Sequence, residues 1–173
     1  MKKTLIVSFE GPEGSGKTTV IEAVKKYLED RKCSYAVLRE PGSTQIGEHI
    51  RDVILNTQHT QMDVYTELLL YLACRVQLIK EKILPALSRN RVVILDRFTD
   101  STLVYQGFAG GISLPWLQKV VKEFALGITP DITFFLDVDA RLGLTRSRRK
   151  DRMEQKSIQF HRTVRQGYAA LAK

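Results

Sequence analysis

Four short apolar runs recur along the chain, at residues 5–9, 35–38, 91–96 and 132–137. Valine, isoleucine, leucine and phenylalanine dominate them, with little polar alternation. Near-continuous apolar runs of this length are typical of strands buried on both faces of a parallel sheet. We therefore predict four parallel strands.

The segments between these runs carry apolar residues at the three- and four-residue intervals of amphipathic helices, as in Val20, Val24 and Leu28. The predicted helices cover residues 16–31, a segment from about 44, residues 62–87, a segment capped by Ser113, a short arginine-rich stretch and residues 153–172. Strands that alternate with helices predict an α/β fold, in which helices flank a parallel sheet in three layers. A length of 173 residues suits one domain over residues 1–173.

The first predicted strand leads into residues 11–18, which read GPEGSGKT and fit the pattern G-x-x-x-x-G-K-[ST]. A strand, a glycine-rich turn and a helix form the context that a P-loop requires, and we therefore predict the three-layer P-loop NTPase fold. Its amides surround phosphate oxygens at a helix N-terminus. We expect Lys17, as an exposed loop lysine, to reach the β- and γ-phosphates, and the Thr18 hydroxyl to ligate Mg²⁺. The predicted ATP-binding residues are Gly11, Pro12, Glu13, Gly14, Ser15, Gly16, Lys17, Thr18 and Thr19.

Polar side chains follow the other strands, and ligands of parallel sheets gather at the carboxyl ends of the strands. Arg39 and Glu40 follow the second strand, Asp96 and Arg97 end the third, and Asp137 ends the fourth. Asp96 stands where a P-loop enzyme places an acid that helps to hold Mg²⁺, although a helix-capping or ion-paired aspartate is the alternative. The planar fork of Arg97 can clamp a phosphate with two hydrogen bonds.

The long helix predicted over residues 62–87 places Tyr71 and Arg75 one turn apart on one face. Taken alone, Tyr71 is either a core side chain, the commoner case for an aromatic in a helical stripe, or a surface for stacking a base.

Composition adds few constraints. The formal net charge of +8 invites a nucleic-acid partner, but aromatic residues are not interleaved with the basic ones and no nucleic-acid-binding motif occurs. A solvated basic surface, or basic groups around polyphosphate substrates, explains the charge as well. Cys33 and Cys74 lack metal-ligand spacing, which favours reduced thiols in the cytoplasm. No apolar run is long enough to span a membrane.

Several runs together resemble the thymidylate kinases, the bacterial form in particular. They are residues 9–19, 39–42, 67–75, 96–101 with 105–107, 129–131 and 151–155, in matching order and spacing. Many enzymes share a P-loop, but this combination is specific and covers nearly the whole chain. The resemblance implies transfer of the γ-phosphoryl group of ATP to dTMP, with Mg²⁺, giving dTDP and ADP.

The resemblance also implies individual roles around the acceptor. Arg97 would bind the 5′-phosphate of dTMP, and Arg75 would reach a thymine carbonyl. Tyr71 would stack on thymine, where the family usually has phenylalanine. Tyr105 would fill the space of a ribose 2′-hydroxyl, and Glu13 would contact the sugar 3′-hydroxyl. The full predicted acceptor set is Glu13, Arg39, Arg51, Tyr71, Arg75, Arg97, Ser101, Thr102, Tyr105 and Gln106.

The chain departs from the family pattern in the lid, about residues 141–152, which is shorter than usual. The P-loop interior holds no cation before Lys17. We therefore expect Arg146, Arg148 and Arg149 to supply transition-state charge alongside Lys17 and Arg97; a solvated helix face is the alternative. The family pattern continues past Ala172 into a further strand and helix, which this sequence lacks, either because this version is short or because residues are missing.

Two rival functions remain open on the sequence. One is a kinase for a different nucleoside or nucleoside monophosphate, and the other is a P-loop switch protein that controls a partner. The acceptor residues weigh against both. Members of the family are usually homodimers, and the helix from Met62 is a plausible interface.

Overall fold

The computed structural model describes residues 4–147 and 151–172. Its sheet has four strands in the order β2-β3-β1-β4, and every pairing is parallel. The strands are β1 (Leu5–Glu10), β2 (Tyr35–Arg39), β3 (Val92–Asp96) and β4 (Ile132–Phe135). These positions confirm the α/β prediction. The fourth strand ends two residues early, because its partner β1 ends at Glu10, which is opposite Phe135.

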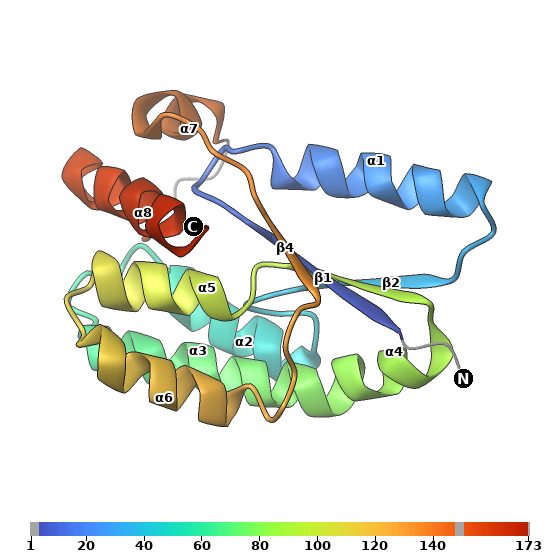
Figure 1. The fold of residues 1–173 in the computed structure, drawn as a ribbon. Coiled ribbons are helices and arrows are strands. Elements are labelled where there is room, and N and C mark those ends of the chain that lie inside the picture. Colours follow the sequence, from blue (N-terminus) through green and yellow to red (C-terminus); the bar gives the residue numbers. More distant parts are fainter. Residues whose placement is uncertain (1–3, 148–150, 173) are drawn as a thin grey trace.

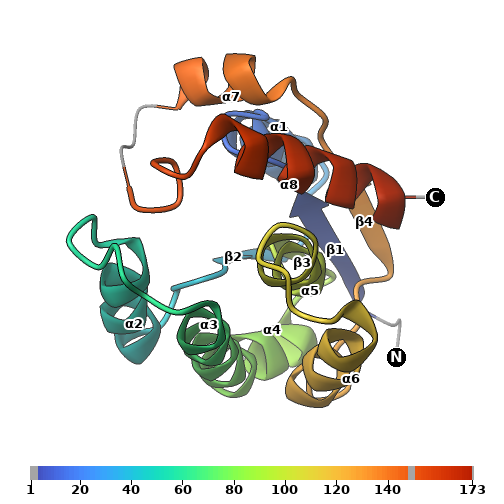
Figure 2. The ribbon, with the colours of Figure 1, turned by 90° about the vertical axis from the view of Figure 1, so that its left-hand side faces the viewer.

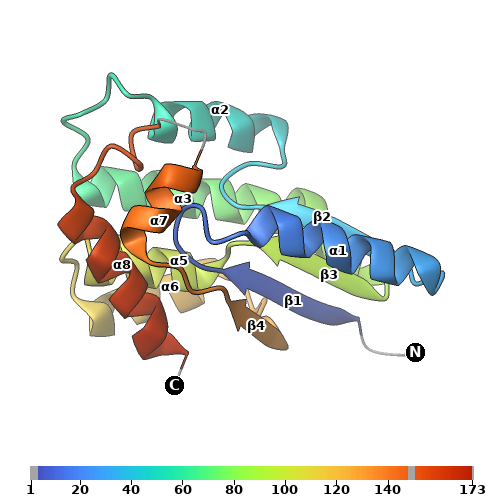
Figure 3. The same cartoon turned by 90° about the horizontal axis from the view of Figure 1, so that it is seen from above.

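Helices cover both faces of the sheet (Figures 1 and 2). One layer holds α1 (Lys17–Asp30), α7 (Ala140–Arg146) and α8 (Ile158–Leu171), and Figure 3 shows α7 beside α8. The other layer holds α2 (Gln45–Leu55), α3 (Val64–Leu78), α4 (Leu84–Arg89) and α6 (Leu114–Phe124). A short helix α5 (Thr99–Thr102) and a π-helical segment at Leu103–Phe108 pack against both layers, on α8 and on α6.

The core lies on both sides of the sheet. Along β1, Ile6 packs in one cluster with the end of α3 and with α4, whereas Val7 and Phe9 pack with Ile21 of α1 on the other side. Successive residues of a strand point to opposite faces, so both faces of the central strands are apolar. This is why the predicted strands read as continuous apolar runs. Among the described residues, no helix is long and apolar enough to cross a membrane.

The long helix predicted over residues 62–87 is interrupted. Asp63 caps α3 by accepting the Tyr65 N–H at 2.8 Å, and α3 continues into a π-helical segment at Ile79–Ile83 before α4. Pro85 stands at the start of α4 and has no N–H to donate to the preceding turn. The regular α-helical hydrogen-bond ladder is therefore broken ahead of this proline, at the π-helical segment Ile79–Ile83.

The last helix also starts later than predicted, at Ile158 instead of Met153. Ser157 caps it by accepting the Phe160 N–H at 3.1 Å. Upstream, the Asp151 carboxylate accepts the N–H groups of Met153 and Glu154, which forms a separate turn. Side chains that bond to local N–H groups therefore decide this boundary.

Candidate active site

A cavity of about 470 Å³ opens at the carboxyl ends of the strands, between the P-loop, the loop after β2, the end of β3 and the segment before α8. Side chains from all the predicted acceptor positions line it. The predicted site residues on its wall are Glu13, Gly14, Lys17, Thr18, Arg39, Arg51, Tyr71, Arg75, Asp96, Arg97, Ser101, Thr102, Tyr105 and Gln106. The fold thus brings together residues that lie up to 93 positions apart in the chain, from Glu13 to Gln106.

The P-loop turns sharply at its glycines, and Gly14 has a positive φ of 65°. A Cβ on Gly14 would lie 2.0 Å from the carbonyl oxygen of Gly143, and a Cβ on Gly143 would lie 2.3 Å from that of Glu13. Helix α7 therefore packs directly on the P-loop, and both glycines are needed for this close approach.

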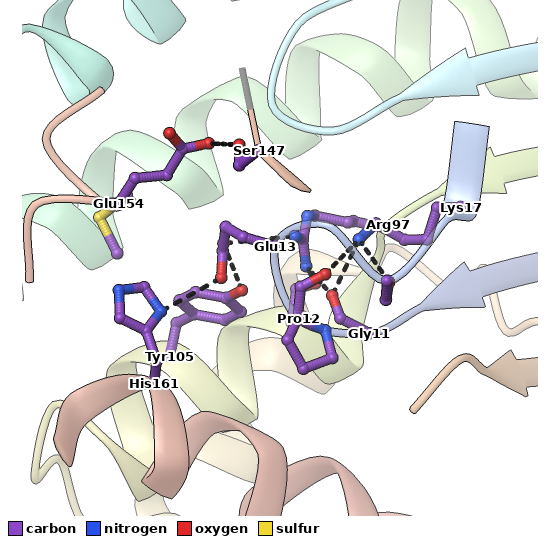
Figure 4. Close-up of polar contacts among 12 residues, drawn as sticks. Gly11, Pro12, Glu13, Lys17, Arg97, Tyr105, Ser147, Glu154 and His161 are labelled. Carbon is purple, nitrogen blue, oxygen red and sulfur yellow. Dashed lines mark hydrogen bonds and ion pairs between the residues drawn. The ribbon is translucent and has the colours of Figure 1, made fainter. Parts of the chain in front are cut away.

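Lys17 is buried, not exposed as predicted. Its ammonium group donates to the carbonyl oxygens of Gly11 and Pro12, both at 2.9 Å, and to the Ser15 hydroxyl at 3.3 Å (Figure 4). Burial, with the charge of Arg97 nearby, lowers the pKa of Lys17 to about 7. An anion beside the ammonium group would favour its charged form.

Arg97 has a positive φ of 69°, which is uncommon for residues other than glycine and asparagine. This turn sends its guanidinium group back toward the P-loop. Nη1 donates to the Gly11 carbonyl at 2.8 Å and to the Tyr168 hydroxyl at 2.9 Å, and Nη2 lies 3.4 Å from Glu13 Oε1. The cation therefore stands between the P-loop and the rest of the cavity.

Glu10 holds this arrangement from beneath. Its side chain is 1% exposed, and its Oε1 accepts the Phe98 N–H at 2.7 Å. Its Oε2 accepts the hydroxyl groups of Ser101 at 2.6 Å and Tyr168 at 3.1 Å. We call Glu10, Arg97, Ser101, Tyr105 and Tyr168 the acceptor wall. Sequence reasoning missed Glu10 and Tyr168; a glutamate that ends a buried apolar strand was the one available signal.

Glu13 of the P-loop faces the acceptor wall (Figure 4). The Tyr105 hydroxyl donates to its Oε1 at 2.6 Å, and Nδ1 of His161 lies 3.4 Å from its Oε2. Burial alone would raise the pKa of Glu13, but His161, Arg97 and Tyr105 together outweigh it and lower the pKa to about 2. Glu13 is therefore a carboxylate at neutral pH.

Arg75 forms a second wall of the cavity and is 1% exposed. Its Nε lies 2.7 Å from Glu40 Oε1, and its Nη2 donates to the Thr102 hydroxyl at 2.7 Å. Among the described residues its Nη1 has no hydrogen-bond partner, so a donor remains for a ligand. Tyr71 is partly buried beside it and lines the cavity, so it is not a pure core residue.

Two further arginines lie at the rim. Nη2 of Arg39 donates to both carboxylate oxygens of Glu48, at 2.7 and 2.8 Å. Nη1 of Arg51 donates to the Pro41 carbonyl at 2.9 Å. These bonds fix the loop after β2 over the cavity.

Gln106 belongs to a buried network that the sequence did not indicate. Its Nε2 donates to Glu67 Oε1 at 2.8 Å, and Nη2 of Arg152 donates to Glu67 Oε2 at 2.5 Å. Nε of Arg152 also donates to the Ile54 carbonyl at 2.7 Å. Gln106 is 1% exposed and bonded to protein, and the network ties the end of the lid to α3.

Of the three predicted lid arginines, the structure describes only Arg146. Arg146 is exposed at the end of α7 and does not line the cavity. Arg148 and Arg149 lie outside the described residues. Asp137 does not line the cavity either, and both its oxygens accept from Arg165 at 2.7 Å.

The metal ligands predicted from the sequence, Thr18 and Asp96, line the same cavity. Among residues 4–147 and 151–172, no three or more histidine, cysteine or acidic side chains form a metal-binding group. Mg²⁺ at a nucleotide needs only one or two protein oxygens, because phosphates and water supply the others. A hydroxyl and a carboxylate at this cavity fit that requirement.

A P-loop, Arg97 and Arg75 line one cavity at the carboxyl ends of a parallel sheet. This arrangement defines a P-loop kinase of small phosphorylated molecules. A family model described as thymidylate kinase matches residues 9–173. The thymidylate kinase of Clostridium novyi (strain NT) is 44% identical over 177 aligned positions, covering 99% of this chain and 86% of that protein. The chain therefore belongs to the thymidylate kinase family, the kinases that phosphorylate dTMP.

The fold agrees with a solved structure. The crystal structure of the thymidylate kinase from Ehrlichia chaffeensis superposes with a TM-score of 0.80 at 31% identity, covering 99% of this chain and 87% of that chain.

Proposed function

We propose that the chain transfers the γ-phosphoryl group of Mg²⁺-bound ATP to the 5′-phosphate of dTMP, giving dTDP and ADP. The observation that carries the proposal is the position of Arg97, whose guanidinium group contacts the Gly11 carbonyl of the P-loop and opens onto the same cavity as Arg75 and Tyr71. One cation thus lies between the site of the donor phosphates and the site of the acceptor.

On the donor side, the P-loop amides and Lys17 hold the phosphates. Lys17 must exchange its bonds to the Gly11 and Pro12 carbonyls for bonds to phosphate oxygens. Thr18 and Asp96 would hold Mg²⁺, which supplies positive charge at the phosphates when bound. Phosphoryl transfer needs little covalent help, so positioning and charge are the main contributions of the protein.

On the acceptor side, Arg97 binds the 5′-phosphate with its planar fork. The ring of Tyr71 stacks on thymine. The Nη1 of Arg75, which has no hydrogen-bond partner in the described part of the chain, donates to a thymine carbonyl. Ser101 and Thr102 lie beside the base, and Arg39 and Arg51 close the rim. Tyr105, held by Glu13 at 2.6 Å, fills the space of a 2′-hydroxyl. Glu13 receives the sugar 3′-hydroxyl.

A panel of acceptors tests the proposal. ADP release would be measured with ATP and dTMP, dUMP, dCMP, dGMP, dAMP, UMP and CMP in turn, with and without Mg²⁺. We expect the highest kcat/KM for dTMP and no turnover without divalent cation. A higher kcat/KM for another monophosphate would mean that the acceptor site has been misassigned. A nucleotide switch, the rival from another class, would give no single turnover of dTMP with excess enzyme.

We also propose a homodimer interface on the helical layer that contains α3 and α6. Leu69 and Tyr65 of α3 are 64% and 52% exposed, and Trp116 of α6 is 47% exposed with its ring 6.1 Å from that of Tyr65. Exposed apolar side chains gathered on neighbouring helices are typical of an interface. We expect a dimer in sedimentation equilibrium, and we expect Leu69→Asp to shift it to a monomer. A monomeric parent chain would contradict this assignment.

A further inference from the structure

His161 of α8 is a buried titratable side chain with no role in the reaction described above. It is 1% exposed, and within the described residues neither ring nitrogen has a hydrogen-bond partner. Buried polar groups are nearly always hydrogen-bonded, so a side chain with two unpaired nitrogens needs an explanation. Helix α8 places His161, Val164 and Tyr168 along one buried stripe, and Tyr168 already belongs to the acceptor wall.

The carboxylate of Glu13 in the P-loop lies beside His161. Nδ1 lies 3.4 Å from Oε2 of Glu13, slightly beyond the usual range of an N–H···O bond. Oε2 has no hydrogen-bond partner among the described residues, whereas Oε1 accepts from Tyr105 at 2.6 Å. Figure 4 shows the imidazole aimed at the carboxylate from the side opposite Arg97. The two oxygens of Glu13 therefore face different elements, and a small shift would complete the second bond.

We propose that His161 is a positioning residue for Glu13. Its Nδ1–H donates to Oε2 and fixes the rotation of the carboxylate, so that Glu13 receives the 3′-hydroxyl of the acceptor sugar at a set angle. The inference rests on the proposed function, in which Glu13 contacts that hydroxyl. It makes α8 a contributor to sugar recognition through a residue that never touches the substrate.

Three substitutions separate positioning from packing. His161→Asn puts an amide N–H near the place of Nδ1, His161→Gln puts one near the place of Nε2, and His161→Leu keeps bulk without a donor. Exposed His49 of α2 supplies the control, His49→Leu. Steady-state kinetics would be measured with dTMP and with 3′-deoxythymidine 5′-monophosphate, which lacks the 3′-hydroxyl, and thermal unfolding would report the fold.

Loss of one hydrogen bond to a charged group is expected to weaken ligand binding about tenfold. We expect His161→Leu and His161→Gln to raise the KM for dTMP about tenfold, with kcat and the KM for ATP changed less than about threefold. His161→Asn should restore the KM to within about threefold of the parent. With the 3′-deoxy acceptor, the parent and all three variants should share one KM.

Two outcomes overturn the inference while the parent still turns over dTMP. One is an unchanged KM for dTMP in both the Leu and Gln variants, and the other is an equal rise for both acceptors, which would mean packing alone. If His161→Leu does not fold, the Asn and Gln variants decide the matter between themselves. A parent without dTMP turnover would instead overturn the proposed function, and the inference with it.

Discussion

The acceptor wall and the lid hold their charged side chains in different ways. In the acceptor wall, Arg97 is fixed by carbonyl, hydroxyl and carboxylate groups, and Glu10 beneath it is 1% exposed and fully engaged. In the lid, Arg146 is exposed at the end of α7, whereas Arg152 at the far end is buried and paired with Glu67.

The proposed function gives this difference a physical reason. Groups that bind the ground-state acceptor gain from being rigid before the ligand arrives, because no ordering cost remains. Charges needed only while the phosphoryl group is in transit can be recruited afterwards. The comparison predicts that changes in the wall alter acceptor affinity, whereas changes in the lid alter kcat.

The largest effect is expected at the P-loop, which lies beside both the acceptor wall and the lid. Lys17→Ala should lower kcat by about 10³-fold, because a preorganised cation at the developing charge is removed. Activity would be followed as ADP release and the fold by circular dichroism, with Lys26→Ala on the exposed side of α1 as the control. Retention of more than about a tenth of the activity would count against the P-loop assignment.

The lid comes next. The triple variant of Arg146, Arg148 and Arg149 to alanine should lower kcat about 100-fold with little change in the KM for dTMP, since an arginine over the phosphoryl group acts in the transition state. Arg141→Ala, also exposed on α7, is the matched control. Near-parental kcat in the triple variant would leave these arginines as a solvated helix face.

Arg97→Lys should have the complementary signature. Loss of the planar fork should raise the KM for dTMP about 10- to 100-fold and that for ATP far less, because a lysine cannot reproduce a bidentate contact. Arg89→Lys on the exposed end of α4 controls for charge-conserving change. An equal loss for both substrates would erase the distinction between donor and acceptor sides.

A smaller effect is expected on sugar choice. Tyr105→Ala opens room for a 2′-hydroxyl, so the preference for dTMP over its ribose counterpart should narrow about tenfold. The ratio of the two kcat/KM values is the measurement, and Tyr27→Ala on α1 serves as the control. An unchanged ratio would place sugar discrimination elsewhere in the wall.

The last prediction concerns stability, not rate. The pKa of Glu13 is about 2 in the fold, against an ordinary value of 4.5, so the unfolded chain binds more protons between these pH values. Glu13 therefore contributes stability above pH 4.5, of about 3 kcal/mol at most, and this is lost as the pH falls toward 2. Urea unfolding of the parent and of Glu13→Gln should differ most near neutrality and converge in acid. Exposed Glu123→Gln should follow the parent at every pH.

The sequence by itself determined the strands and the nucleotide loop. The apolar runs at β1 and β3 are typical of strands buried on both faces of a parallel sheet, and the P-loop pattern indicates a phosphate site formed by its own backbone. Residues at the carboxyl ends of strands, such as Arg97, were predictable because the topology brings those ends together. The family resemblance supplied the roles of Tyr71, Arg75 and Tyr105, because the local sequence around these residues does not specify a role.

Only the tertiary structure decided which polar side chains support these residues. Tyr168 meets Glu10 across 158 positions, and Arg152 meets Glu67 across 85. A tyrosine or an arginine in a helix has the same local pattern whether it faces water or a buried partner, so no period in the sequence separates the two cases. Burial makes each of these bonds strong and each loss costly, and burial is a property of packed elements.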